Sequence, residues 1–302
     1  MERALVTGAT GFVGSHVARG LLGRGVEVHA LVRPGAHLER VPDLVGRVAV
    51  HVDDGTVAGL AAVVDDARPE ATFHLATNFV AEHGPDDVVA LVADNVGFPT
   101  RLADALAGEG TAFVNVGTGW QHVDGARYRP KSLYAASKQA FEDMLRFYTD
   151  RDLLRAVTVN LYDSYGPLDH RPKLLGALIR SLHTGDVLPM SSGVQLVDLV
   201  HVDDIVDALL RAAALAGDAP VVPGARDDVA YYSVSSGRPR TLRELVDVLG
   251  AVAGHPVPVE WGARADRAGD MVVPWDAGPP VPGWAPGVTL EEGLARLLAE
   301  SG

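Results

Sequence analysis

The sequence predicts an α/β fold in which a doubly wound parallel sheet is followed by a smaller C-terminal lobe. In the first half of the chain, short β-branched apolar runs alternate with helical patterns. Several of these runs are apolar throughout, which is typical of strands buried on both faces of a sheet. A glycine-rich turn separates the first run from the first helical pattern. Such alternation produces parallel strands joined by right-handed helical crossovers.

The elements follow one another in a regular order up to residue 166 and less regularly beyond it. Strands are predicted at 3–7, 26–32, 48–52, 71–75, 112–116 and 156–161. Helices are predicted at 11–22, near 57–66, within 86–106 and at 133–149, where apolar residues recur with helical spacing. Proline and glycine become frequent after residue 166, and the helices predicted there are 173–182, 202–216, 242–253 and 290–298.

This change of pattern divides the chain into two parts. Residues 1–166 form the first domain, and residues 167–302 form the smaller lobe. We expect part of 196–216 to pack back on the first domain. No internal repeat and no low-complexity tract interrupts this division.

Composition excludes several classes of protein. Of 302 residues, 47% are apolar and 22% are charged, which is typical of a globular chain. The net charge of −13, without any block of lysine or arginine, argues against nucleic acid as a partner. No run approaches the roughly 18 apolar residues of a membrane span. The N-terminus lacks a secretory pattern, so we expect no membrane association and a cytoplasmic location.

The chain has no cysteine, which excludes disulfides, thiolate metal sites and a cysteine nucleophile. No group of histidine, aspartate and glutamate shows convincing metal-ligand spacing in the sequence, so no metal is expected.

The glycine-rich turn at 7–14 reads Thr-Gly-Ala-Thr-Gly-Phe-Val-Gly. It follows a strand and opens a helix, as in the Rossmann fold, where the helix N-terminus offers free N–H groups to a pyrophosphate. A plain strand–turn–helix is the alternative explanation, since this glycine pattern alone is weak. The context favours a dinucleotide site. The contacts expected from this turn are Gly8, Thr10, Gly11, Phe12, Val13 and Gly14.

The end of the second strand indicates which dinucleotide is bound. Folds that select NAD usually carry an acidic residue there, which holds the ribose 2′-hydroxyl. This chain has Arg33 after Val32 and no acid at that point. A guanidinium suits the 2′-phosphate of NADP(H). The alternative is that Arg33 is an ordinary solvated surface residue.

Tyr134 and Lys138 stand four residues apart in a predicted helix, which places both side chains on one face. A nearby ammonium is expected to lower the pKa of the phenol, so the pair is a candidate proton donor and acceptor. Thr118 follows the fifth strand, at the sheet edge where α/β folds bind ligands, and could orient a substrate oxygen. A turn threonine that bonds its own backbone is the alternative.

Together these residues resemble the extended short-chain dehydrogenase/reductase family of nucleotide-sugar epimerases, dehydratases and reductases. The resemblance covers nearly the whole chain and includes the segments 74–77, 161–167, 198–204 and 267–270. It implies Thr118, Tyr134 and Lys138 as catalytic residues. The further cofactor contacts that it implies, besides Arg33, Tyr134 and Lys138, are Asp53, Asp54, Leu75, Ala76, Thr77 and Leu161.

Departures from the family pattern narrow the expected activity. Family dehydratases carry an Asp-Glu pair directly after the catalytic threonine, where this chain has Gly119 and Trp120. The segments 162–167, 171–174 and 195–200 look most like nucleotide-sugar 4-ketoreductases of the CDP-abequose and paratose synthase type. The substrate contacts expected from position and resemblance are Thr118, His122, Asp163, Lys173, Gln195, Arg267 and Asp270.

The expected activity is therefore the NADPH-dependent reduction of a nucleotide-linked 4-keto-6-deoxy sugar. Tyr134 would supply the proton, Lys138 would bind the nicotinamide ribose, and Thr118 would orient the carbonyl. An NAD(P)-dependent nucleotide-sugar 4-epimerase is the first alternative. A non-catalytic NADP-binding sensor is the second, since a fold alone does not establish an activity. The resemblance also implies a homodimer formed by the helices within 86–106 and 133–149.

Overall fold

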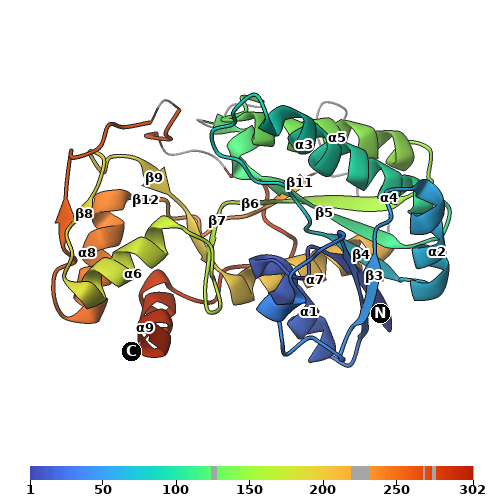
Figure 1. Ribbon diagram of the computed structural model, residues 1–302, viewed down its shortest axis with the longest axis horizontal. Coiled ribbons are helices and arrows are strands. Elements are labelled where there is room, and N and C mark those ends of the chain that lie inside the picture. The colour runs from blue at the N-terminus through green and yellow to red at the C-terminus, as the bar shows by residue number, and fades with distance from the viewer. Residues whose placement is uncertain (124–127, 219–230, 268, 274–276, 302) are drawn as a thin grey trace.

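The computed structural model describes residues 1–123, 128–218, 231–267, 269–273 and 277–301. Its main feature is a seven-stranded parallel sheet with the strand order β11-β6-β5-β4-β1-β2-β3 (Figure 1). The strands are β1 (Arg3–Thr7), β2 (Glu27–Val32), β3 (Ala49–Val52), β4 (Ala71–His74), β5 (Ala112–Thr118), β6 (Arg155–Leu161) and β11 (Tyr231–Val234). The order reverses between β1 and β4, and ligands of such sheets bind beyond the carboxyl ends of the strands at that point.

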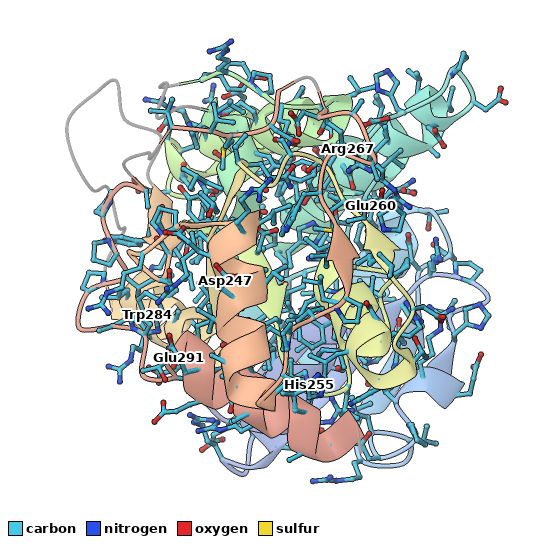
Figure 2. All side chains as sticks on the ribbon, turned by 90° about the vertical axis from the view of Figure 1, so that its left-hand side faces the viewer. Asp247, His255, Glu260, Arg267, Trp284 and Glu291 are labelled. Carbon is cyan, nitrogen blue, oxygen red and sulfur yellow. The ribbon has the colours of Figure 1, made fainter. Side chains whose placement is uncertain are left out.

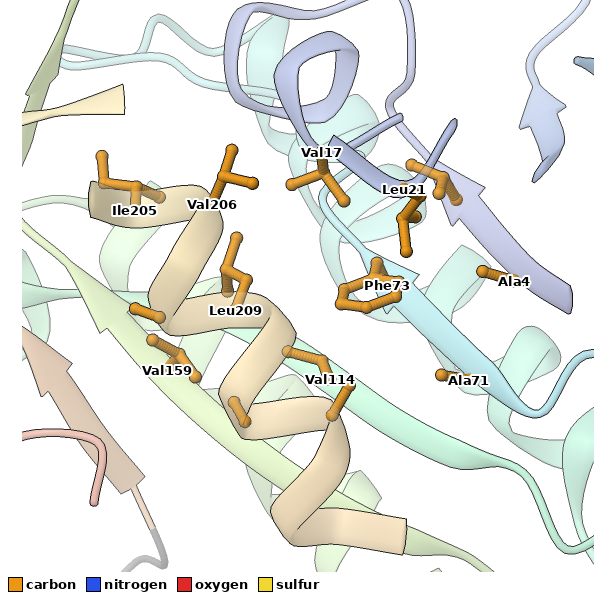
Figure 3. Close-up of a cluster of buried hydrophobic side chains, with 14 of the residues drawn as sticks. Ala4, Val17, Leu21, Ala71, Phe73, Val114, Val159, Ile205, Val206 and Leu209 are labelled. Atoms are coloured by element: carbon orange, nitrogen blue, oxygen red, sulfur yellow. The ribbon is translucent and has the colours of Figure 1, made fainter. Parts of the chain in front are cut away.

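Helices cover both faces of the sheet (Figure 1). One face carries α1 (Phe12–Leu22) and α7 (Val202–Asp218), and the other carries α2 (Val57–Ala67), α4 (Phe98–Leu106) and α5 (Leu133–Thr149). In Figure 3, Val206 and Leu209 of α7 lie close to Val17 of α1 and Phe73 of β4 within one apolar cluster. Burial on both faces is what the uniformly apolar strands predict.

The predicted helix within 86–106 consists of three consecutive segments. These are α3 (Asp87–Val92), a π-helical turn at Ala93–Gly97, and α4. The buried Asn95 lies in the π turn, and its side chain bonds both Asn78 and Ser137. The wide turn therefore directs an amide from this helix toward the start of α5.

A second lobe is built on α6 (Leu174–Thr184), α8 (Leu242–Ala253) and α9 (Leu290–Ser301), which share an apolar core. Thr241 and Glu244 form a capping box at the start of α8, which fixes where that helix begins. Short strand pairs surround the helices: β7 (Asp163–Tyr165) with β10 (Leu199–His201), β8 (Leu188–Pro189) with β13 (Val259–Glu260), and β9 (Leu196–Val197) with β12 (Arg240–Thr241).

The main sheet continues beyond residue 166. The run Tyr231–Val234 forms β11, pairs in parallel with β6, and was not among the predicted strands. The second half of the chain therefore contributes one strand, β11, to the main sheet and one helix, α7, that packs on its face. Within the described ranges, no helix is long and apolar enough to cross a membrane.

Candidate active site

A cavity of about 1660 Å³ lies at the carboxyl edge of the sheet, and residues of both lobes line it. Its volume exceeds the roughly 300–1,000 Å³ of pockets for single drug-sized ligands. The wall includes the β1–α1 turn, the ends of β2, β4 and β5, the start of α5, and residues along α6. Such a space can accommodate two ligands placed end to end.

The glycine-rich turn forms one part of this wall. Gly8 has φ of +72°, and a Cβ there would approach the backbone nitrogen of Ala76 to 2.7 Å. A Cβ on Gly14 would collide with the carbonyl oxygen of Gly8. Gly11 is the N-cap of α1 and makes no side-chain capping bond, so the first N–H groups of that helix face the cavity. The lining residues of this turn are Gly8, Thr10, Gly11, Phe12, Val13 and Gly14.

Two arginines stand on the wall beyond the end of β2. Arg33 is exposed there, as its position in the sequence predicts, and Arg40 lies on the same wall. Asp53 also lines the cavity, and Arg101 of α4 reaches its two carboxylate oxygens at 3.3 and 3.2 Å. Asp54 does not line the cavity. Its carboxylate instead accepts bonds from the backbone and hydroxyl of Thr56 at 2.8 and 2.7 Å and shapes the turn before α2.

Tyr134 and Lys138 occupy the first two turns of α5, whose start Ser132 caps. Tyr134 lines the cavity, whereas Lys138 is 3% exposed and does not line it. Thr118, at the carboxyl end of β5, lines the cavity as well. Its hydroxyl accepts a bond from the backbone N–H of Trp120 at 3.3 Å, so its own hydrogen can be donated to a ligand.

Burial controls the ionisation of this pair. Burial raises the pKa of Tyr134 to about 12, while a hydrogen bond with Thr77 acts in the opposite direction. Burial also lowers the pKa of Lys138 to about 8, which the charge of Glu142 opposes. The expectation that Lys138 depresses the Tyr134 pKa is therefore wrong for the protein alone, because desolvation of the phenolate dominates. The structure thus favours Tyr134 as a proton donor.

Aromatic rings pack around Tyr134. The ring of Phe79 lies edge-on to it at 4.9 Å between centroids, and the ring of Trp120 lies at 6.5 Å. The ammonium of Lys131 lies 4.8 Å from the centre of the Trp120 ring. These contacts make the surroundings of the phenol apolar, and sequence reasoning did not identify Phe79 or Lys131. In the sequence, Trp120 is notable only because it stands where family dehydratases carry an acidic residue.

Two predicted substrate residues bridge the lobes. Asp270 accepts a bond from Nζ of Lys131 at 3.1 Å and does not line the cavity. Arg267 lies on the cavity wall, and its Nε is 3.5 Å from a carboxylate oxygen of Glu82. Figure 2 shows Arg267 in the upper part of the view, well above His255.

The remaining predicted substrate residues divide into two groups. Asp163, Lys173 and Gln195 line the cavity on the side of the second lobe. Burial raises the pKa of Asp163, and the charge of Lys173 opposes this effect. His122 is buried at the end of the short 3-10 turn after β5 and does not line the cavity. Leu75, Ala76, Thr77 and Leu161, from the predicted cofactor set, line it.

One group of three side chains with metal-binding atoms occurs in the described part of the chain, away from the cavity. It consists of His29, His51 and Asp66 on β2, β3 and α2. The imidazole planes differ by 14°, and Nδ1 of His29 lies 2.9 Å from Nε2 of His51. This is the geometry of a direct N–H···N hydrogen bond, in which each nitrogen already faces the other.

The cavity fits a dinucleotide. The glycine turn leaves backbone N–H groups open to a pyrophosphate, and the ends of β2 and β3 provide polar residues where an adenosine would lie. Leu75, Ala76 and Leu161 supply an apolar wall between that end and Tyr134. The residues that would hold a nicotinamide dinucleotide are therefore present in one continuous wall.

Comparisons with known proteins agree with this geometry. The UDP-glucose 4-epimerase of Mycolicibacterium smegmatis is 29% identical, over 98% of this chain and 97% of its own. The CDP-abequose synthase of Salmonella typhimurium is 23% identical, over 98% and 97%. The solved structure of the Thermus thermophilus UDP-glucose 4-epimerase in complex with NAD is 27% identical, with a TM-score of 0.80, and each chain is covered to 98%.

The family model matches most of the chain, from residue 4 to residue 222, which includes the glycine turn and the Tyr134–Lys138 pair. The parallel sheet and its strand order are those expected for a dinucleotide-binding enzyme of this kind. The protein belongs to the NAD dependent epimerase/dehydratase family.

Proposed function

We propose that the protein is an NADPH-dependent reductase of a nucleotide-linked 4-keto-6-deoxy sugar. The observation that carries this proposal is the convergence of Thr118 and Tyr134 on one cavity wall with Lys138 buried directly behind. The Asp-Glu pair that family dehydratases carry after the threonine is missing, because Gly119 and Trp120 follow Thr118. CDP-abequose synthases among the relatives support a reductase of a 6-deoxy sugar.

The choice of NADPH over NADH rests on the wall beyond β2. Arg33 and Arg40 both lie there, and the residue that follows Val32 is not acidic. Two guanidinium groups favour the 2′-phosphate, whereas an acid would favour the free 2′-hydroxyl. When bound, the reduced nicotinamide supplies the hydride that adds to the keto carbon.

The chain's own residues handle the proton and the developing charge. The Thr118 hydroxyl donates a hydrogen bond to the carbonyl oxygen, which orients and polarises the carbonyl group. Tyr134 donates its phenolic proton to the same oxygen as that oxygen gains negative charge. The raised pKa of Tyr134 keeps this proton in place at neutral pH. Lys138, as an ammonium, stabilises the phenolate that is left behind.

The substrate is proposed to enter from the second lobe. Lys173, Gln195 and Arg267 line that part of the cavity and provide donors for the diphosphate and sugar hydroxyls. Asp163 stands where the family usually carries an asparagine, so it offers an acceptor to a sugar hydroxyl or to a base amine. Asp270 is held by Lys131 at 3.1 Å and accepts the backbone N–H of Arg267 at 3.3 Å, so it would keep Arg267 in place beside the ligand.

A 4-epimerase is the second candidate, and the relatives favour it specifically. The Mycolicibacterium UDP-glucose 4-epimerase is more identical to this chain, at 29%, than the CDP-abequose synthase at 23%. An epimerase would use the same tyrosine first as a base and then as an acid, with no net consumption of the dinucleotide. A binding-only sensor has no chemical need for Thr118, Tyr134 and Lys138 together.

The deciding experiment follows the reduced-nicotinamide absorbance. The purified protein is mixed with NADPH or NADH and with CDP-, TDP- and GDP-linked 4-keto-6-deoxy sugars. In a parallel reaction it is mixed with NAD+ or NADP+ and UDP-glucose, and the product is analysed for UDP-galactose. Loss of absorbance equal to the keto sugar consumed, faster with NADPH, is the expected result. Isomerised UDP-sugar without loss of absorbance would replace the reductase by the epimerase. Tyr134→Phe is the control, and it should bind NADPH but give neither product.

A further inference from the structure

We propose that Glu142 is a positioning residue that holds Lys138 in its ammonium form from beneath the active site. The proposal builds on the proposed role of Lys138 in the reaction. Tyr134, Lys138 and Glu142 follow one another at intervals of four residues on α5. This spacing places all three on the helix face that packs on the sheet, with Lys138 between the phenol and the carboxylate.

Glu142 is a buried carboxylate that is fixed in place. It is 5% exposed, and its Oε1 accepts a bond from Nε2 of Gln121 at 2.9 Å. The same Gln121 nitrogen also bonds Gln139 at 3.1 Å, while its oxygen accepts the backbone N–H of Thr118 at 2.9 Å. A single glutamine therefore connects the carboxylate beneath Lys138 with the backbone of the threonine at the cavity wall.

The strand opposite Glu142 leaves room for it. Gly117 of β5 faces the carboxylate, and a Cβ there would come within 3.0 Å of Oε1 and collide with the side chain of Asn160. The other oxygen of Glu142 is buried and has no hydrogen-bond partner among the described residues. An acid kept in such a place, rather than an apolar side chain, requires a compensating interaction.

Lys138 is the group that supplies this interaction, because it is buried one helical turn before Glu142 on the same face of α5. Burial drives the pKa of Lys138 down, and Glu142 acts against this effect. Burial drives the pKa of Glu142 up to about 7, and both Gln121 and Lys138 oppose that change. Each group therefore favours the charged form of the other, against burial, which disfavours both charges.

The other titratable groups near the pair cannot replace Glu142. His74, from β4, is fully buried, and its pKa lies well below its ordinary value, so it is neutral. The phenol of Tyr134 keeps its proton. Asp143, the neighbouring acid on α5, raises the pKa of Glu142 and is exposed. The pKa of Tyr128 is itself raised, in part by Glu142 and Asp143.

The lysine content of the chain makes the proposal directly measurable. There are three lysines, Lys131, Lys138 and Lys173. Protein labelled with ¹³C at the lysine ε-carbon gives one NMR resonance for each, and the resonance lost in Lys138→Arg identifies Lys138. Titration of the whole chain then gives the pKa of Lys138 without substrate or cofactor.

In Glu142→Gln, the titration midpoint of Lys138 should fall by about one pH unit or more, which is about a tenfold loss of ammonium at alkaline pH. The midpoints of Lys131 and Lys173 should not move. Asp143→Asn is the matched control, since it removes an exposed acid from the next position and should leave Lys138 within a few tenths of a unit. An unchanged Lys138 midpoint in Glu142→Gln overturns the proposal.

Glu142→Asp is a second test that does not depend on the folding of Glu142→Gln, because it keeps the negative charge on a shorter side chain. It should give a midpoint between those of the wild type and Glu142→Gln, and a midpoint at or below that of Glu142→Gln contradicts the proposal. The pH dependence of keto-sugar reduction is the second readout, and its alkaline limb should move to lower pH in Glu142→Gln. A shifted Lys138 midpoint in a protein that reduces no keto sugar would support the role of Glu142 and reject the reductase.

Discussion

Lys131 of the first domain and Asp270 of the second lobe form an ion pair, with Nζ and Oδ1 3.1 Å apart. The pair is mostly shielded from solvent, since 18% of the lysine side chain and 9% of the aspartate side chain are exposed. The ammonium also lies against the ring of Trp120, which packs on Tyr134, the proposed proton donor. The ion pair therefore joins the second lobe to the immediate surroundings of Tyr134.

Loss of this pair should weaken substrate binding more than chemistry. Lys131→Met removes a shielded charge-assisted bond, which contributes on the order of 1.5–3 kcal/mol. We expect KM for the nucleotide sugar to rise about tenfold or more, with kcat within a factor of about three and an unchanged Kd for the dinucleotide.

Glu82→Gln provides the comparison for that variant. It breaks a second pair between the lobes, with Arg267, in which the side chains of Glu82 and Arg267 are 76% and 68% exposed. Exposed pairs contribute about 0–1 kcal/mol, so KM should change by less than about threefold. Equal effects of Lys131→Met and Glu82→Gln in steady-state kinetics would contradict a special role for the shielded pair.

Arg33→Ser should change the choice of dinucleotide. If Arg33 contacts the 2′-phosphate, its loss should weaken NADPH binding by about 10- to 100-fold and leave NADH binding within about twofold. Fluorescence titration of both dinucleotides gives the two Kd values. Equal losses for both would mean that Arg33 does not distinguish the 2′-phosphate, and Arg40→Ser would then be the next variant to compare.

The ionisation of the site predicts a pH profile for reduction. Tyr134 must keep its proton to donate it, and its pKa of about 12 leaves it protonated throughout the accessible range. Lys138 must carry its charge, and that charge is lost as the pH rises through about 8. The rate should therefore fall above about pH 8 because of Lys138, as measured by kcat from pH 6 to 10. A rate that rises with pH would show that a phenolate base, as in an oxidative first step, limits the reaction.

Local patterns in the sequence predicted the first domain well. The bounds of α5 agree with the predicted 133–149, because its cap and its helical periodicity are both local features. The strand β11 was missed, since four residues preceding an irregular segment carry little periodicity. Its identity depends on pairing with β6, which lies more than 60 residues earlier in the chain. Pairing at that distance leaves no local pattern.

The same distinction applies to the site. The turn at 7–14 and the Tyr134–Lys138 pair were found because their residues are neighbours in sequence. The partners of Asp53 and Asp270 lie 48 and 139 residues away, so their ion pairs with Arg101 and Lys131 could not be foreseen. The raised pKa of Tyr134 follows from the burial of its side chain, and the four-residue spacing of Tyr134 and Lys138 does not show how deeply that side chain is buried.

Exposed apolar side chains on α3 and α5 predict how two copies of the chain associate. These helices lie side by side on the outer surface of the first domain (Figure 1). Val89 of α3 is 79% exposed, and Phe147 of α5 is 52% exposed. Val92 and Met144 are exposed on the same two helices. Exposed apolar side chains are typical of an interface, which supports the homodimer that the family resemblance implies for these helices.

Phe147→Glu should convert that dimer into a monomer, because a carboxylate that is buried without a partner in the interface opposes association. Light scattering coupled to size exclusion chromatography measures the mass of both forms. Val187→Glu is the matched control, since Val187 is 61% exposed but lies in the second lobe, and this variant should remain a dimer. A wild type that is already monomeric at micromolar concentration would reject the interface. Dissociation of Val187→Glu as well would place the contact elsewhere on the molecule.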